Sequence, residues 1–360
     1  MGGPDLTLDR LTRRHGTNTV LNELSLTLPG GRFSVLLGPS GCGKSTTLRL
    51  IAGLDEPSAG RVLIGRRDVT GLPPKARGVA MVFQSYALFP HLTAAENIVF
   101  GLRARSVPPT ERTKRLRWAA ELLDIGPLLS RRPAQLSGGQ QQRVALGRAI
   151  VAEAPVCLMD EPLSNLDAQL RAEMRRELVG LQRRLGLTML YVTHDQTEAM
   201  AMADLVVLLR EGTLEQAATP EVIYQRPATC FAARFIGAPP MNLLPLERCE
   251  GGYVIAGTNA PVLALPHDVP LLAGLRPEAL AYAKGNGRSL SLRLRYCEYL
   301  GADTVLSGFI GSGAMPLVAR LPGRVAADPG DAIMLEFDPL DLHLFDAVSG
   351  VRFAADPILA

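Results

Sequence analysis

A run of eight residues from Gly38 to Ser45, Gly-Pro-Ser-Gly-Cys-Gly-Lys-Ser, constrains the fold of this chain more than any other feature. Its glycines permit the backbone conformations in which successive N–H groups turn toward one anion. The apolar run before it predicts a strand at Phe33–Leu37, and the spacing after it predicts a helix over Lys44–Ala52. The pattern therefore indicates a phosphate-binding loop between a strand and the positive end of a helix.

We expect this loop to bind a nucleotide, with Lys44 on the β- and γ-phosphates and the Ser45 hydroxyl on Mg²⁺. The alternative is a glycine-rich turn before a basic helix, but a chance match to the whole pattern is rare. The residues expected to contact the nucleotide here are Gly38, Pro39, Ser40, Gly41, Cys42, Gly43, Lys44, Ser45 and Thr46.

Short apolar runs alternate with helical patterns in the first part of the chain, which favours a parallel sheet covered by helices, an α/β fold. Between residues 89 and 153 helical spacing predominates, so we expect a helical subdomain with Trp118, Leu122 and Leu123 in its core. A longer helix is expected over Gln169–Leu185. Further strands are expected at Val79–Phe83, Val156–Asp160, Met189–Thr193 and Leu205–Leu209.

The composition and pattern of the sequence change at Gly237. From there prolines become frequent, and short runs of alternating apolar and polar residues begin. Such runs, separated by Gly and Asp, predict small antiparallel barrels. We therefore expect a nucleotide-binding α/β domain over residues 1–236 and an all-β domain over residues 237–360. Strands are expected at Ser289–Tyr296, Thr304–Ile310, Ala332–Phe337 and Leu342–Phe345.

Charge and cysteine content exclude some classes of protein. The net charge of +3 is too small to indicate a nucleic-acid partner. The basic residues from Arg112 to Arg117 fit the solvent-exposed face of a helix better than a nucleic-acid-binding patch. No apolar run reaches membrane-spanning length. The five cysteines include no C-x-x-C pair, so we expect free thiols in a reducing compartment.

Polar side chains follow three of the expected strands. Asp160 and Glu161 end one of them, His194 follows the next, and Gln84 follows a third. Taken alone, Asp-Glu-Pro fits an exposed turn, but beside a phosphate loop it indicates a magnesium acid at Asp160 and a base for water at Glu161. His194 can bond a γ-phosphate oxygen, and Gln84 can ligate Mg²⁺ or the water.

A second candidate anion site is the run Leu136–Gln140, Leu-Ser-Gly-Gly-Gln, before a helix expected over Gln141–Val151. Ser137 and Gln140 fit a capping box, and adjacent glycines before a helix can also bind an anion. This run resembles the signature of the ABC-transporter ATPases. The resemblance implies that Ser137, Gly138, Gly139 and Gln140 of one chain close on the ATP held by the phosphate loop of a second copy.

Other segments match the same family in order. Ser164–Asp167 resembles the loop that crosses the dimer interface, Gln84–Pro90 resembles the segment that contacts a transmembrane permease, and His194 matches the switch histidine. One departure is His15, where the family carries an aromatic residue that stacks on adenine. An imidazole can stack there, with less area.

The second half resembles the carbohydrate-importer subgroup, whose C-terminal region is an oligonucleotide-binding-like regulatory barrel. Matching runs are Phe235–Asn242, Gly274–Glu278 and Leu342–Asp346. Leu300–Asp303 resembles importers of sn-glycerol 3-phosphate, and maltose- or trehalose-type sugars are the alternative solutes. The resemblance implies ATP-driven uptake at the cytoplasmic face of the inner membrane, with two permease subunits and, indirectly, a periplasmic solute-binding protein.

Two rival functions remain open at this point. A non-transport ABC ATPase usually carries two cassettes or a long coiled-coil insertion, whereas this chain has one of each motif. A binding module whose ATPase has decayed would be expected to lose Lys44, Asp160, Glu161 or His194, and all four residues are present.

Overall fold

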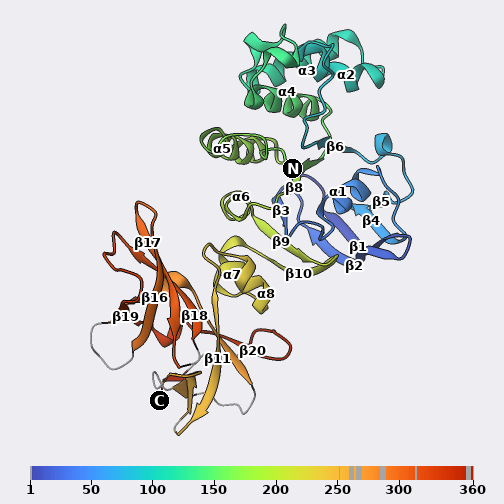
Figure 1. The fold of residues 1–360 in the computed structure, drawn as a ribbon. Helices are drawn as coiled ribbons and strands as arrows, with labels where there is room; N and C mark the ends of the chain where they lie inside the picture. Colours follow the sequence, from blue (N-terminus) through green and yellow to red (C-terminus); the bar gives the residue numbers. More distant parts are fainter. Residues whose placement is uncertain are drawn as a thin grey trace. The chain divides into compact units, whose positions relative to one another are not determined.

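Five apolar runs form the parallel strands of one six-stranded sheet (Figure 1). The strand order is β10-β9-β3-β8-β7-β6, with only β10 antiparallel. β3 and β8 are buried along their whole length, as expected when helices cover both faces of a parallel sheet. The strands are β3 Phe33–Leu37, β6 Val79–Val82, β7 Val156–Asp160, β8 Thr188–Val192, β9 Leu205–Arg210 and β10 Thr213–Ala218.

A second, antiparallel sheet precedes and follows the first helix, in the order β2-β1-β4-β5. Its strands are β1 Leu6–His15, β2 Asn18–Leu28, β4 Ala59–Ile64 and β5 Arg67–Asp68. The sequence analysis did not predict this sheet. Leu6 and Leu8 alternate inward, and a register shift before Leu11 then returns that side chain to the core. The extra residues disrupt the period of two by which strands are recognised.

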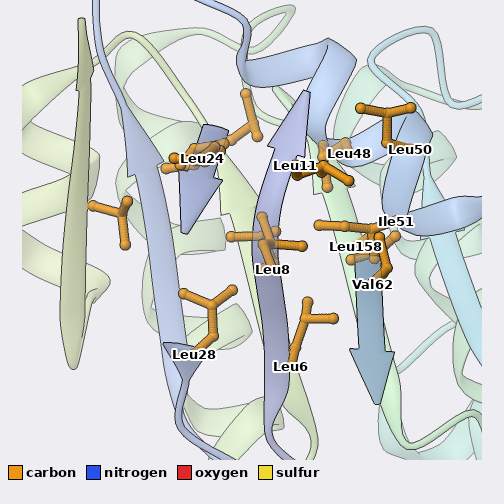
Figure 2. Close-up of a cluster of buried hydrophobic side chains, with 14 of the residues drawn as sticks. Leu6, Leu8, Leu11, Leu24, Leu28, Leu48, Leu50, Ile51, Val62 and Leu158 are labelled. Carbon is orange, nitrogen blue, oxygen red and sulfur yellow. The ribbon is translucent and has the colours of Figure 1, made fainter. Parts of the chain in front are cut away.

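The two sheets share one hydrophobic core with helix α1, Lys44–Ala52 (Figure 2). Leu8 and Leu11 of the antiparallel sheet and Leu158 of the parallel sheet belong to the same cluster, and Leu158 lies next to Ile51 in Figure 2. Leu48 and Ile51 of α1 are fully buried with them. The helix after the phosphate loop is therefore fixed between two sheets.

The computed structural model describes residues 2–250, 252–258, 263–264, 270–283, 289–312, 314–353 and 358–359. The chain divides into two units, Met1–Glu221 and Val222–Ala360, and each is considered by itself. No helix among the described residues has the length and apolar character needed to cross a membrane.

The helical subdomain contains α2 Ala94–Ala104, α3 Pro109–Leu122 and α4 Gly138–Ile150, which lie together in Figure 1. Two short 3₁₀ turns, η2 Gly126–Leu128 and η3 Pro133–Gln135, connect α3 to α4. Another 3₁₀ turn, η1 Pro74–Ala76, precedes β6. Helices α5 Ala168–Leu185 and α6 Gln196–Met202 follow β7 and β8.

The expected core position of Trp118 is wrong, since its side chain is 38% exposed. The buried side of α3 is formed by Ala119 and Ala120 and continues to Leu123 after the helix, while Leu122 is half-buried. Those buried positions follow the helical spacing of three and four residues, and Trp118 lies outside that stripe. It lines the rim of a cavity of about 200 Å³ that also includes Cys157 and Leu185.

The second unit contains two antiparallel sheets, ordered β20-β14-β11-β12-β13-β21 and β15-β19-β16-β17-β18. All four strands expected after Gly237 are present, as β16, β17, β19 and β20. The unit begins with α7 Pro220–Gln225, which crosses its boundary, and α8 Cys230–Phe235, and 3₁₀ turns η4 Pro277–Ala279 and η5 Pro339–Asp341 follow. The strands are β11 Asn242–Cys249, β12 Gly252–Ile255, β13 Leu263–Ala264, β14 Leu271–Leu275, β15 Ala281–Tyr282, β16 Ser289–Tyr299, β17 Asp303–Ile310, β18 Met315–Pro322, β19 Ala332–Glu336, β20 His343–Asp346 and β21 Ile358–Leu359.

Arg276 explains why the segment around α7 and α8 belongs to the second unit. Its guanidinium is buried and donates to the Ala233 carbonyl at 3.0 Å and the Tyr224 carbonyl at 2.9 Å. The guanidinium carbon also lies 4.1 Å from the centre of the Tyr224 ring. A cation at the ends of both helices fits the negative pole of each.

Arg77 serves the C-terminal end of α1 in a similar way. Its guanidinium donates to the carbonyls of Leu50 at 2.6 Å and Ile51 at 3.1 Å, and also to Leu72 at 2.7 Å and Thr70 at 2.6 Å. Burial lowers the pKa of Arg77. Because charged hydrogen bonds to buried groups are costly to lose, this residue holds the phosphate-loop helix in its place.

We expect Arg77→Ala to lower the free energy of unfolding of the first unit by about 3 kcal/mol, since four carbonyls lose a charged donor. Urea denaturation followed by circular dichroism measures the change. Arg66→Ala, at an exposed position of the β4–β5 turn, is the matched control and should change the value by less than about 0.5 kcal/mol. Equal effects of the two substitutions would contradict the role given to Arg77.

Candidate functional site

The phosphate loop connects β3 to α1 and takes a conformation that only glycine adopts easily. Gly38, Gly41 and Gly43 have φ of 155°, 80° and 103°. A Cβ on Gly38 would lie 2.5 Å from the Leu209 carbonyl oxygen, and one on Gly43 would lie 2.5 Å from Leu21 Cδ2. The loop is therefore pressed between β9 and β2, and its glycines are needed for both space and conformation.

Lys44 turns back into this loop. Its Nζ donates to the carbonyls of Gly38 at 2.8 Å and Pro39 at 2.9 Å, and the side chain is only 7% exposed. The Cys42 thiol is 3.9 Å away, and burial raises its pKa. The loop thus concentrates a cation and the positive end of α1 beside the more exposed Pro39, Ser40 and Gly41.

Ser45 begins α1 together with Lys44 and meets the end of β7. Its hydroxyl donates to Asp160 Oδ1 at 3.0 Å. Burial raises the pKa of Asp160, a hydrogen bond from Ser45 opposes this, and the neighbouring Glu161 adds to it. Thr46 follows, half-buried in the first turn. The pair of oxygen ligands expected from the sequence, Ser45 and Asp160, is therefore together at one edge of the sheet.

Glu161 and His194 also lie at this edge. His194 Nδ1 is 3.2 Å from Glu161 Oε1, with the histidine side chain 61% exposed and the glutamate 20%. Glu161 has φ of 43°, and its backbone N–H donates to the Val192 carbonyl at 3.0 Å. A left-handed non-glycine residue costs free energy and is found at functional positions more often than elsewhere.

Gln84 follows β6 and is exposed, with its Nε2 3.4 Å from Ser164 Oγ. Asn165 Nδ2 donates to the Gln84 carbonyl at 3.1 Å, and the Ser164 hydroxyl donates to the Glu161 carbonyl at 2.9 Å. These bonds connect Gln84 to Glu161 through the loop Ser164–Asp167. Since β3, β8, β7 and β6 are parallel neighbours, their carboxyl ends deliver all these side chains to one edge.

The run Leu136–Gln140 forms a capping box, as expected. Gln140 N–H donates to the Ser137 hydroxyl at 3.4 Å, and Ser137 N–H donates to Gln140 Oε1 at 3.1 Å. The expected start of the helix at Gln141 is wrong, because α4 begins at Gly138. A Cβ on Gly139 would lie 2.9 Å from Leu170 Cδ2, so close packing against α5 outweighs the low helix propensity of glycine.

The structure does not bring this run to its own phosphate loop. In the described part of the chain, no hydrogen bond or ion pair joins Ser137–Gln140 to Gly38–Thr46. The two segments belong to α4 of the helical subdomain and α1 of the sheet core (Figure 1). His15 is exposed at the end of β1, before the turn at Gly16.

Sequence reasoning missed two residues that support the site. Arg171 Nη2 donates to the Leu166 carbonyl at 2.9 Å, and its Nη1 is 3.7 Å from Asp195 Oδ2. Asp195 also caps α6 by accepting from Thr197 N–H at 2.7 Å. Arg171 of α5 therefore connects the loop before this helix, through Leu166, to the residue after His194. An Asp at a helix start, directly after a candidate histidine, was the available signal.

Residues 21–164 match the family of ABC transporters, and residues 273–345 match the TOBE domain. The first match contains the phosphate loop, Gln84, the capping-box run, Asp160 and Glu161.

Relatives cover almost the whole chain. The chain is 45% identical over 345 residues to the sn-glycerol-3-phosphate import ATP-binding protein UgpC of Paracoccus denitrificans, covering 96% of this chain and 98% of the relative. It is 46% identical to the protein of the same name from Ruegeria pomeroyi, covering 97% and 99%. It is also 43% identical to the sulfoquinovosyl glycerol transport ATP-binding protein SmoE of Agrobacterium fabrum, covering 96% and 98%.

A solved structure resembles the first part of the chain. It is the dimeric, post-hydrolysis state of the ATP-binding cassette MJ0796 bound to ADP and Pi, with a TM-score of 0.54 and 32% sequence identity. The match covers 60% of this chain and 98% of that one. The similarity supports the α/β nucleotide-binding fold of the sheet core.

We expect Gly43→Ala to weaken ATP binding at least about tenfold, because the new Cβ would collide with Leu21 and distort the loop. Gly41→Ala is the matched control. Its φ of 80° is also left-handed, but a Cβ there meets nothing within 4 Å, so its loss of affinity should be clearly smaller. Titration with a fluorescent ATP analogue measures both. Equal losses would show that the collision has no effect.

Proposed function

The chain belongs to the ABC transporter family, and from this premise we propose that it is the ATP-hydrolysing subunit of an importer of sn-glycerol 3-phosphate. One observation supports the enzymatic part most directly. Lys44, Ser45, Asp160, Glu161 and His194 come from three neighbouring strand ends and lie at a single edge of the sheet. The proposed solute is that of the relatives from Paracoccus denitrificans and Ruegeria pomeroyi, which are 45% and 46% identical to this chain over nearly its whole length.

Sugars of the maltose or trehalose type remain the alternative class of solute. The relative named for sulfoquinovosyl glycerol is 43% identical over a similar length, so the family resemblance extends to sugar conjugates of glycerol. An ATPase subunit does not contact the solute, and its residues therefore carry little direct information on this choice.

Phosphate binding is assigned to the loop between β3 and α1. Lys44 would exchange the Gly38 and Pro39 carbonyls for phosphate oxygens, while the loop amides and α1 offer further positive charge. The nucleotide-contacting set comprises Gly38, Pro39, Ser40, Gly41, Cys42, Gly43, Lys44, Ser45 and Thr46. His15 is proposed as the adenine contact, since its exposed ring ends β1.

The oxygen atoms of Ser45 and Asp160 fit Mg²⁺. They lie 3.0 Å apart, and the described residues contain no cluster of three or more His, Cys, Asp or Glu side chains that would suit another metal. Mg²⁺ commonly takes few protein ligands and fills its shell with phosphate oxygens and water. When bound, it would offset the negative charge of the phosphates, and Gln84 is a third candidate ligand.

Glu161 is proposed as the base that orients the attacking water, with His194 as the γ-phosphate contact. The two side chains already face each other at 3.2 Å, and the Glu161 backbone is held by β8. A base beside a phosphate loop needs this fixed placement, because it must lie within reach of the water it orients.

The second half of the site is assigned to another copy of the chain. Ser137, Gly138, Gly139 and Gln140 form a helix start that is separated from the phosphate loop of the same chain. In a symmetric dimer each copy would complete the site of the other, so two sites form together. The dimeric neighbour structure supports this arrangement. ATP would then favour the closed dimer, and hydrolysis would release it.

The remaining assignments concern partners and domains. We propose an ATPase domain over residues 1–236 and a regulatory domain over residues 237–360 that includes the TOBE match. Residues 222–236 are the connecting segment between them, and this segment packs within the second compact unit through Arg276. Gln84–Pro90 is proposed to contact two transmembrane permease subunits at the cytoplasmic face of the inner membrane. A periplasmic solute-binding protein would act through those permeases.

We expect Glu161→Gln to bind ATP and form dimers while hydrolysing it at least about 100-fold more slowly, because the base is lost and the phosphate contacts are kept. Phosphate release and size-exclusion chromatography with ATP measure the two properties. Glu211→Gln, in an exposed turn, is the control and should keep normal turnover. Normal turnover in Glu161→Gln would remove Glu161 from this role.

We expect deletion of the gene to abolish uptake of labelled sn-glycerol 3-phosphate and to leave uptake of labelled maltose unchanged. The intact gene should restore uptake, and a Lys44→Ala version should not, because it lacks the phosphate contact. Uptake by whole cells measures both solutes. Loss of maltose uptake with normal glycerol phosphate uptake would transfer the proposal to the sugar class.

A further inference from the structure

The segment after Gln84 contains two consecutive non-glycine residues in the left-handed region. Tyr86 has φ of 60° and Ala87 has φ of 47°. Neither residue type favours this region, and two in succession raise the cost. Tyr86 N–H donates to the Phe83 carbonyl at 2.9 Å and so closes the turn Phe83–Tyr86 that leads into the left-handed pair. Such a strained turn persists only if the surrounding structure holds it.

Arg148 of α4 provides that support. Its Nη1 donates to the Ala87 carbonyl at 2.6 Å, and its Nη2 donates to the Tyr86 carbonyl at 2.6 Å. The planar guanidinium thus contacts both left-handed residues with its two ends. No acidic side chain pairs with Arg148 among the residues that the structure describes, so its charge is directed to these carbonyls.

The Tyr86 side chain adds to the fixation of the turn. Its ring is 4% exposed, so the turn is anchored to the interior at this point. Ala87 is exposed, and its carbonyl has Arg148 as its donor. Release of Arg148 would therefore leave Tyr86 buried and free the part of the turn that faces outward.

Arg148 also connects the turn to the other functional end of α4. Ser137 caps the start of the same helix, about 16 Å away along its axis. A helix of this length moves as a rigid element, so a shift of Ser137 is carried to the carbonyls of Tyr86 and Ala87. Gln84 lies two residues before Tyr86, at the edge that holds Glu161.

We propose that Arg148 is a positioning residue that locks the left-handed turn Tyr86–Ala87 and thereby joins the permease-contact segment to the helix that begins at Ser137. This inference rests on the proposed function, which assigns the segment Gln84–Pro90 to the permease contact and Ser137 to the ATP of a second copy. The lock itself is a property of the chain and can be tested without any partner.

The test uses the full chain with Arg148→Gln, alone and combined with Ala87→Gly. The single variant should speed amide exchange in residues 84–90 about tenfold and lower kcat for ATP about tenfold, because Gln84 loses its fixed place. KM for ATP should stay within about twofold, since Lys44 and Ser45 keep their contacts. Ala87→Gly removes part of the left-handed penalty, so the double variant should recover most of both losses.

Ala314→Gly is the matched control in the Arg148→Gln background. Ala314 has φ of 50° and is exposed in a turn of the second unit, so the substitution relieves the same kind of conformation elsewhere. It should restore neither exchange protection nor kcat. Recovery with Ala314→Gly, or no recovery with Ala87→Gly, would overturn the proposal, as would unchanged exchange in Arg148→Gln.

Arg148→Lys replaces the glutamine variant if that protein does not fold, because an ammonium keeps the charge but lacks the two-ended fork. The same rescue by Ala87→Gly is then required. Failure of the proposed function can be told apart from failure of the Arg148 proposal, because a wild-type chain without ATPase activity would refute only the proposed function. Exchange in residues 84–90 would still decide whether Arg148 locks the turn.

Discussion

The Lys44 ammonium, held by the carbonyls of Gly38 and Pro39, is the interaction on which the nucleotide site depends. It requires a loop tight enough to surround a lysine, and that loop requires glycine where the backbone turns left-handed. The tightness in turn comes from Leu21 on one side and Leu209 on the other. The antiparallel sheet and the parallel sheet are thus both needed to shape a single loop.

Parallel strand order explains why chemically different side chains meet. The residues after β3, β8, β7 and β6 are distant in sequence, yet neighbouring parallel strands end at the same edge. The strand runs could be predicted from apolar spacing, so the convergence of Lys44, Asp160 and His194 could be predicted as well. Their distances could not, because these depend on local bonds such as that of Glu161 N–H to Val192.

Several features of the structure could not be predicted from local sequence patterns. The antiparallel sheet was missed because the shift before Leu11 breaks its alternation, and Trp118 was misplaced because its spacing of four residues from Leu122 also fits a buried helix face. The helix start at Gly138 depends on the packing of Gly139 against Leu170, which is a contact between distant segments. Arg171 and Arg148 act on backbone carbonyls, and carbonyl partners leave no signature in a sequence.

Arg77 and Arg148 bind backbone carbonyls in two different settings: Arg77 holds the core helix α1, and Arg148 holds the strained turn Tyr86–Ala87. Arg77 binds four carbonyls around a core helix, where loss of the guanidinium removes a charged donor from each of them. Arg148 binds two carbonyls of a turn that is itself strained and partly exposed, so its bonds offset a cost that the backbone carries. In the first arrangement, the hydrogen bonds meet no opposing backbone strain. In the second, strain and hydrogen bonding oppose each other, and a small movement of α4 can shift the balance between them.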